Sequence, residues 1–204
     1  MDGNNRWSLK NKISKYQAYK IGAKRLINLS NYIFSNTEIK YISAFVLSKN
    51  NLKRSAKIIN VIKKILYESL VEIKNHKTYF DLVIIGDVEF LDLKTKNMIK
   101  TINKKNIFKK KLILYLNYGG KEDIEQAAKS NLYNSVEKNL LSGGFPDPEV
   151  LIRTGGFNRL SNFLLYQISF TELFFLKKLW PDLNSTDIKK IISNFRKIKR
   201  KFGK

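Results

Sequence analysis

Two arginines and a serine lie close to a glycine pair in the C-terminal third of the chain. Arg153, Arg159 and Ser161 flank Gly155–Gly156. A guanidinium group binds phosphate oxygens in pairs, so two of them beside a hydroxyl suit a diphosphate better than a single carboxylate. The turn is therefore a candidate diphosphate site. The competing interpretation is an ordinary turn with solvated arginines, because a glycine turn alone is a weak signal.

The segments on either side of the glycines predict a strand, a turn and a helix. Val150–Thr154 is short, apolar and β-branched, which is typical of a buried strand. Leu160–Gln167 has the pattern of a helix that Ser161 or Asn162 would cap. The free N–H groups and the dipole of such a helix would favour an anion at the turn.

The first seven residues, MDGNNRW, form a second candidate site. Asp, Gly and Asn residues favour loops, and their backbone amides can point inward to hold an anion. Arg6 adds a cation to the same stretch. The alternative is a frayed terminus, which is the usual state of a chain end.

The rest of the chain alternates strand and helix patterns, which predicts an α/β fold with a central, mostly parallel sheet flanked by helices. Residues 1–204 contain no repeat or linker and are expected to form a single domain. Loops after the strands would share the edge of the sheet where active sites gather. Further strands are predicted at Ile39–Leu47, Phe80–Ile85, Lys111–Tyr118 and Thr171–Leu176. Helices are predicted at Lys15–Phe34, Leu52–Ile73, Leu91–Ile102, Lys121–Leu132, Ser135–Leu141 and Asp187–Phe202.

Composition excludes several classes of protein. The chain has no cysteine and one histidine, so disulfides, zinc–thiolate sites and polyhistidine metal centres are excluded. No secretory signal or transmembrane segment is expected, and a cytoplasmic location follows as the default. The net charge of +22 would fit a nucleic-acid-binding module, but the lysines are scattered and no basic recognition helix is evident. We therefore expect no nucleic-acid partner.

The amino-acid sequence of both candidate sites resembles that of the cis-prenyltransferases, the undecaprenyl and dehydrodolichyl diphosphate synthases. The similarity rests on IRTGG-x-x-R-L-S-N-F-L-L, followed by TELFF and LWPD, and on D-G-N-x-R-W at the start. SKNNLKRS, I-I-G-D and N-Y-G-G match further family segments. In the family a short apolar strand precedes D-G-N, and we expect this first strand to be missing here.

The resemblance implies an enzyme that condenses isopentenyl diphosphate with an allylic prenyl diphosphate. It implies Mg²⁺ as cofactor, held by Asp2 and Glu172, with Asp2 and Asn51 as catalytic residues. An apolar tunnel for the growing chain is expected between the sheet and the helices at 15–34 and 52–73. The implied substrate-binding residues are Gly3, Asn4, Arg6, Trp7, Lys15, Tyr19, Ser48, Arg54, Arg153, Arg159 and Ser161.

Several positions depart from the family pattern. Tyr19 stands where a histidine is common, Asn50 replaces a glutamate, and Phe157–Asn158 replaces a polar pair. These changes leave a second function open, a non-catalytic or truncated partner subunit of a heteromeric prenyltransferase. The family also implies a homodimer. The basic outer side of the last helix could contact an anionic membrane peripherally, but docking of its apolar stripe on the core is preferred.

Overall fold

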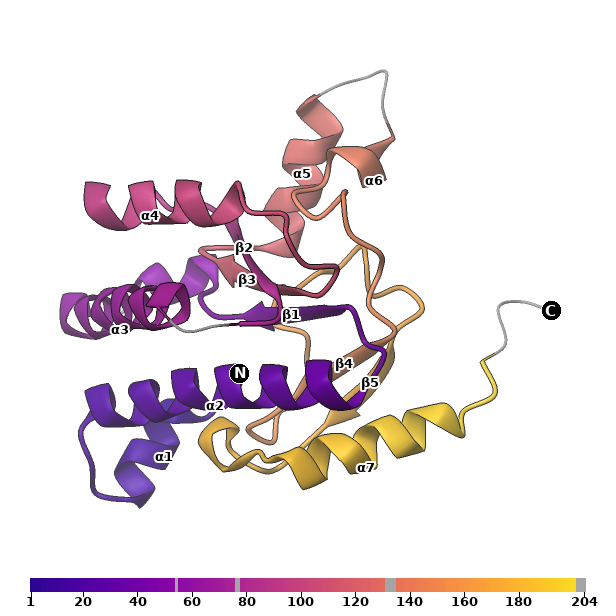
Figure 1. Ribbon diagram of the computed structural model, residues 1–204, viewed down its shortest axis with the longest axis horizontal. Helices are drawn as coiled ribbons and strands as arrows, with labels where there is room; N and C mark the ends of the chain where they lie inside the picture. Colours follow the sequence, from indigo (N-terminus) through magenta and orange to yellow (C-terminus); the bar gives the residue numbers. More distant parts are fainter. Residues whose placement is uncertain (54, 76–77, 131–134, 201–204) are drawn as a thin grey trace.

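The computed structural model describes residues 1–53, 55–75, 78–130 and 135–200. In these residues five strands form two parallel sheets (Figure 1). The first sheet has the order β1-β3-β2, and β4 pairs with β5 in the second. The strands are β1 (Tyr41–Phe45), β2 (Asp81–Gly86), β3 (Lys111–Leu116), β4 (Val150–Arg153) and β5 (Glu172–Phe175). The parallel direction was predicted correctly, whereas the expected central sheet is divided in two.

Helices cover one face of the first sheet, and most of them fall close to the predicted ranges. In Figure 1, α2, α3 and α4 stack beside the first sheet, and α7 lies along the second. The α-helices are α1 (Asn4–Lys10), α2 (Lys15–Asn36), α3 (Ala56–Asn75), α4 (Leu93–Asn103), α5 (Gly120–Ser130), α6 (Val136–Asn139) and α7 (Ser185–Arg196). Two short 3-10 helices, Lys49–Lys53 and Trp180–Asp182, complete the set of described helices.

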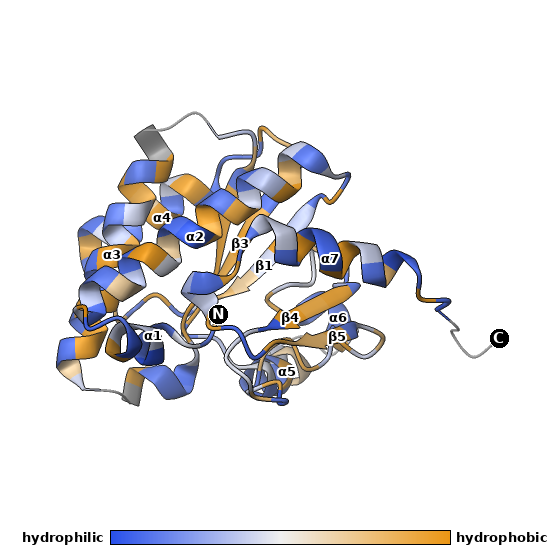
Figure 2. Ribbon diagram, turned by 90° about the horizontal axis from the view of Figure 1, so that it is seen from below, coloured by the Kyte–Doolittle hydropathy of each residue, from blue (hydrophilic) through white to orange (hydrophobic). Residues whose placement is uncertain are grey.

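Strand β3 is buried on both faces and divides the core of the first sheet. Leu112, Leu114 and Leu116 face a cluster that includes side chains of α2, α3 and α4. Ile113 and Tyr115 face the opposite cluster, where residues of the 160–170 segment cover the sheet. This alternation follows from the two-residue period of a strand, and it explains why β3 has no charged residue after Lys111. Figure 2 shows the strands as mainly hydrophobic ribbons between helices of mixed colour.

Helix α7 docks its apolar stripe on the protein, as preferred from the sequence. Ile188 and Ile191 are buried, and Ile188 packs in a cluster with Leu29 and Trp180. The helix ends at Arg196, so the predicted end at Phe202 was too late; Phe202 itself lies outside the described residues. None of the described helices combines the length and the apolar character needed to cross a membrane.

The helix predicted at Leu160–Gln167 is absent, and turns take its place. Ser161, Asn162 and Leu164 have φ values of 54°, 65° and 47°, which a right-handed helix does not allow. Asn162 instead satisfies the start of α5: its backbone O accepts from Gly120 N at 2.8 Å, and its Oδ1 accepts from Lys121 N at 2.8 Å. Asn162, which was predicted as a possible cap of the helix at Leu160–Gln167, therefore caps the start of α5.

The first residues also differ from prediction, because α1 begins at Asn4 where a loop was expected. Gly3, with φ of 113°, turns the chain into this helix, and Trp7 N donates to Gly3 O at 2.8 Å. The Trp7 indole donates to Asp182 Oδ1 at 2.6 Å. Two stretches far apart in the sequence are thereby joined.

Asp81 provides a test of what stabilises the first sheet. The carboxylate is buried and accepts hydrogen bonds from Lys111 Nζ at 2.7 Å and from the N–H groups of Ile107 and Phe108 at 2.8 and 2.9 Å. Burial opposes ionisation, but the Lys111 and backbone hydrogen bonds outweigh it and lower the pKa of Asp81 below its usual value of 3.8.

We expect Asp81→Ala to lower the free energy of unfolding by about 3 kcal/mol at pH 7, because Lys111 loses a buried partner. A carboxyl group with a lowered folded-state pKa stabilises the fold above its unfolded pKa and loses this effect as the pH falls through the folded value. The difference between variant and parent should therefore shrink below about pH 4 in urea denaturation.

Glu89→Ala is the matched control, since the Lys96–Glu89 ion pair spans 2.8 Å but the Glu89 side chain is 79% exposed. Its effect should stay below about 1 kcal/mol. Equal losses in the two variants would contradict this account.

Candidate functional site

The first residues of the chain are fixed next to the end of β4 by hydrogen bonds between the Asp2 backbone and the Thr154 side chain. The Thr154 hydroxyl accepts from Asp2 N at 3.0 Å and donates to Asp2 O at 3.0 Å. Trp180 N also donates to Asp2 O at 3.0 Å. Asp2 thus lies at the carboxyl end of the second sheet, the edge at which sites of parallel sheets form.

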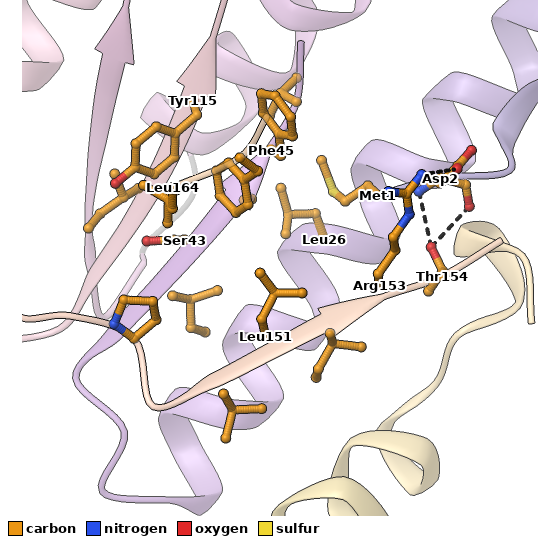
Figure 3. Close-up of a pocket in the computed structure, with 18 of the residues that line it drawn as sticks. Met1, Asp2, Leu26, Ser43, Phe45, Tyr115, Leu151, Arg153, Thr154 and Leu164 are labelled. Atoms are coloured by element: carbon orange, nitrogen blue, oxygen red, sulfur yellow. Dashed lines mark hydrogen bonds and ion pairs between the residues drawn. The ribbon is translucent and has the colours of Figure 1, made fainter. Parts of the chain in front are cut away.

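The Asp2 carboxylate lies between two guanidinium groups. Its Oδ2 is 3.2 Å from Arg153 Nη2, and its Oδ1 is 3.5 Å from Arg6 Nη2. Figure 3 shows Arg153 reaching from β4 to Asp2, with Thr154 beneath them. Asp2 and Arg6 lie near the start of the chain and Arg153 lies in β4. The fold therefore brings together charged groups that are about 150 positions apart in the sequence.

Gly155 makes room for this cluster. Its φ of +95° suits glycine, and a Cβ there would lie 2.6 Å from Arg6 Nη2 and 3.0 Å from Asp2 Cγ. Gly155 N and Gly156 N donate to Lys178 O and Leu176 O, both at 2.9 Å. The predicted glycine turn is therefore confirmed as a close approach, although its N–H groups bind the chain and do not point toward an anion.

A loop after the turn orients Arg153 from the other side. Arg153 Nη1 donates to Ser161 Oγ at 2.7 Å and also to the backbone O of Arg159. The ring of Phe157 lies next to the guanidiniums of Arg159, Arg6 and Arg153, at 4.4, 5.0 and 5.8 Å from its centroid. Among the described residues only one carboxylate, that of Asp2, pairs with these arginines, so the three cations leave an excess of positive charge.

This cluster lies at the rim of a cavity of about 1760 Å³ between β1 and β4. Within the described residues β1 pairs only with β3, and β4 only with β5, so no strand bridges the two sheets. Figure 3 shows Leu26, Phe45, Leu151 and Met1 around the cavity. The predicted tunnel is thus displaced: α2 and α7 wall it, while α3 contributes Ile62. A charged rim and an apolar interior suit a molecule with an anionic head and an apolar tail.

Two shifted pKa values affect the charge of the cavity. Burial lowers the pKa of the Met1 amino group to about 6, although the nearby Asp2 carboxylate opposes this. Burial likewise raises the pKa of Tyr115 to about 12, so its phenol is neutral at ordinary pH. Near neutral pH neither group therefore adds much charge to the cavity.

Most of the residues predicted to form the site meet at this cavity, although they come from four parts of the chain. The following line it: Asp2, Gly3, Asn4, Arg6, Tyr19, Ser48, Asn51, Arg153, Arg159 and Ser161. Trp7 and Lys15 are not among its described lining residues, and Trp7 instead bonds to Asp182. Arg54 lies outside the described residues.

Glu172 lies away from Asp2 in the single chain. It begins β5 opposite Val150, whereas Arg153, which touches Asp2, is opposite Phe175 at the other end of the ladder. Three residues of strand separate these levels by roughly 10 Å. The structure therefore does not bring Glu172 and Asp2 together, and the shared metal role assigned to them stays a prediction.

The residues at the rim can be tested for their fit to Mg²⁺. Within the described part of the chain no three His, Cys, Asp or Glu residues are grouped to hold a metal. The Asn4 Oδ1 atom is buried and lacks a hydrogen-bond partner, and it lies close to Gly22 of α2. The single carboxylate of Asp2 is compatible with the usual Mg²⁺ arrangement, in which one or two carboxylates and several waters join substrate phosphates.

Thr154 and Phe157 belong to the site but were not predicted as site residues. Thr154 is buried and its hydroxyl fixes the Asp2 backbone, and Phe157 contacts all three arginines. Thr154 could have been predicted as a site residue from the sequence, because it lies between Arg153 and Gly155. The role of Phe157 had no signal, because it depends on Arg6 approaching from α1.

Comparison with known proteins agrees with this geometry. A family model described as putative undecaprenyl diphosphate synthase matches residues 1–203. An isoprenyl transferase of Rickettsia typhi is 34% identical, and the alignment covers 100% of this chain and 95% of that protein. A tritrans,polycis-undecaprenyl-diphosphate synthase (geranylgeranyl-diphosphate specific) of Pyrobaculum aerophilum is also 34% identical, with 100% and 93% covered.

Two solved structures resemble the whole fold. Lavandulyl diphosphate synthase from Lavandula x intermedia, in complex with dimethylallyl diphosphate, superposes with a TM-score of 0.86 at 26% identity, covering 100% of this chain and 95% of that one. A probable undecaprenyl diphosphate synthase from Campylobacter jejuni gives a TM-score of 0.77 at 30% identity and 90% coverage of both chains. The chain therefore belongs to the undecaprenyl diphosphate synthase family of prenyltransferases, as its resemblance to the cis-prenyltransferases predicted.

Proposed function

We propose that this prenyltransferase condenses isopentenyl diphosphate with an allylic prenyl diphosphate and extends the chain with cis double bonds. The observation that carries the proposal is the arginine cluster at the rim of a largely apolar cavity. Both substrates have a diphosphate head and an apolar tail. The neighbouring lavandulyl diphosphate synthase, which binds dimethylallyl diphosphate, supports this choice of ligand.

The cluster supplies the charge that two diphosphates require. Arg153 is held by Asp2 and Ser161, so its guanidinium is oriented before a ligand arrives. Arg159 and Ser161, which lie beside it in the loop, would bind isopentenyl diphosphate. Arg6 and the turn at Gly3 would hold the allylic diphosphate. Pre-oriented guanidiniums bind phosphate with little further loss of side-chain entropy.

Asp2 is the residue that would hold Mg²⁺, together with diphosphate oxygens and water. When bound, the ion supplies positive charge that screens the two diphosphates from each other and assists the departure of the allylic diphosphate. Asp2 also has a role that needs no metal, since its carboxylate pairs with both Arg6 and Arg153 and orients them at the rim. The remaining part of the proposal, a homodimer in the cytoplasm with peripheral membrane contact, rests on the family resemblance and the basic α7.

The alternative of a non-catalytic partner subunit receives no support from the comparisons. The relatives and structures described above are named as transferases or synthases. Asp2, Arg153 and Ser161 also contact one another here, although a scaffold has no need to orient them.

Asp2→Ala should reduce turnover by at least about 100-fold, because the substitution removes the carboxylate that orients two arginines and would carry the metal. Incorporation of labelled isopentenyl diphosphate by the purified protein measures this, with Mg²⁺ and a short allylic primer present. Circular dichroism should show a folded variant, since the Asp2 backbone bonds remain. Undiminished incorporation would refute the assignment.

Arg153→Lys should weaken isopentenyl diphosphate binding by about 1–3 kcal/mol, since an ammonium group cannot make paired bonds to phosphate oxygens. Isothermal titration calorimetry gives the change directly. Arg200→Lys is the control, because Arg200 pairs with Glu149 outside the cluster. If the two variants bind equally well, Arg153 does not hold this diphosphate.

Gly155→Ala should weaken diphosphate binding by about tenfold or more, because the new Cβ would displace Arg6 and Asp2. The alanine would also have to adopt a positive φ, which is unfavourable for it. Gly144→Ala is the matched control, since a Cβ there meets nothing within 4 Å. Titration with inorganic pyrophosphate measures both variants. Similar affinity in both would show that the close approach at Gly155 is unimportant for binding.

A further inference from the structure

The Phe157 side chain occupies an unusual position for an apolar residue. Its ring is 40% exposed, and it lies at the cavity rim. The guanidinium carbons of Arg159, Arg6 and Arg153 lie 4.4, 5.0 and 5.8 Å from the ring centroid. These arginines come from the loop after β4, from α1 and from the end of β4. One ring therefore contacts cations from three separate segments.

The charges around the ring do not balance. Asp2 forms ion pairs with Arg6 and Arg153, and within the described residues no ion pair involves Arg159. Three like charges this close repel one another when no anion is bound. The face of an aromatic ring carries partial negative charge and attracts a guanidinium within about 6 Å. The ring thus draws the cations together without a second carboxylate.

A neutral group has an advantage over a carboxylate at this place. A carboxylate would form bidentate bonds with a guanidinium and compete with the diphosphate for the same N–H groups. A ring leaves the N–H groups, which lie in the guanidinium plane, free for the ligand. It also limits the rotamers of long side chains before binding, which reduces the entropy lost on binding.

We propose that Phe157 is a positioning residue whose ring holds Arg159, Arg6 and Arg153 in place for a substrate diphosphate. This inference rests on the proposed function, in which those arginines bind the diphosphates. Phe157 acts through the arginines and takes no part in bond making. Its loss should raise the KM for isopentenyl diphosphate more than it lowers kcat, since the interaction serves ground state and transition state alike.

The test compares four variants of the full chain by calorimetric titration with inorganic pyrophosphate and with isopentenyl diphosphate. Phe157→Leu keeps an apolar side chain but removes the ring, and it should weaken binding by about 5- to 20-fold. Phe157→Tyr keeps the ring and should bind within about twofold of the parent. Phe170→Leu removes another exposed aromatic ring and should bind as the parent does. Arg153→Ala serves as the reference for loss of a guanidinium.

The outcomes separate this inference from the proposed function. If Arg153→Ala weakens binding while Phe157→Leu does not, the positioning role is wrong and the proposed function stands. If Phe157→Tyr binds the diphosphates as weakly as Phe157→Leu does, the aromatic ring does not position the arginines and the inference is also overturned. If Arg153→Ala binds normally, the diphosphate site itself is misplaced. Phe157→Met repeats the test should the leucine variant melt at a much lower temperature.

Discussion

The contact of Asp2 with Arg153 and Thr154 is the interaction on which the site depends. The Asp2 backbone is fixed by two hydrogen bonds with the Thr154 hydroxyl and one from Trp180 N, and the carboxylate then reaches Arg6 and Arg153. The contact joins the first residues of the chain to the second sheet, and α1 starts from this point. An ion pair with partly exposed groups contributes little stability by itself. Its importance here is geometric, because it places cations from different segments on one rim.

The site combines two environments that are normally kept apart. On one side of Arg153 lie guanidiniums, a hydroxyl and a single carboxylate; on the other lie aliphatic side chains of β4, α2 and α7. The net positive charge of the rim is unfavourable until an anion arrives, and the apolar cavity is filled poorly by water. A ligand with a diphosphate head and a hydrocarbon tail satisfies both parts at once, which explains why the two features occur together.

Much of this structure could be predicted from the sequence, and the errors have identifiable causes. The strand around Ile113 was evident because both faces are buried and the residues from Leu112 to Leu116 are uncharged and mainly aliphatic. The grouping of Arg153, Arg159 and Ser161 was also expected, since these residues lie close in the sequence. The prediction of a helix at 160–167 was wrong because Asn162 forms hydrogen bonds with the start of α5 and the Phe163 ring stacks on that of Phe45, with ring centroids 4.5 Å apart. Such long-range contacts override local propensity and leave no periodic signal.

The separation of the two sheets has a consequence for the shape of the cavity. Paired strands are held about 4.8 Å apart by their backbone ladder, whatever side chains they carry. No ladder connects β1 to β4, so the width between these walls is set by how side chains such as Phe45 and Leu151 meet across it. Exchanging one wall residue for a larger or smaller one can therefore resize the interior while every strand pairing stays intact, a freedom that a continuous sheet would not allow.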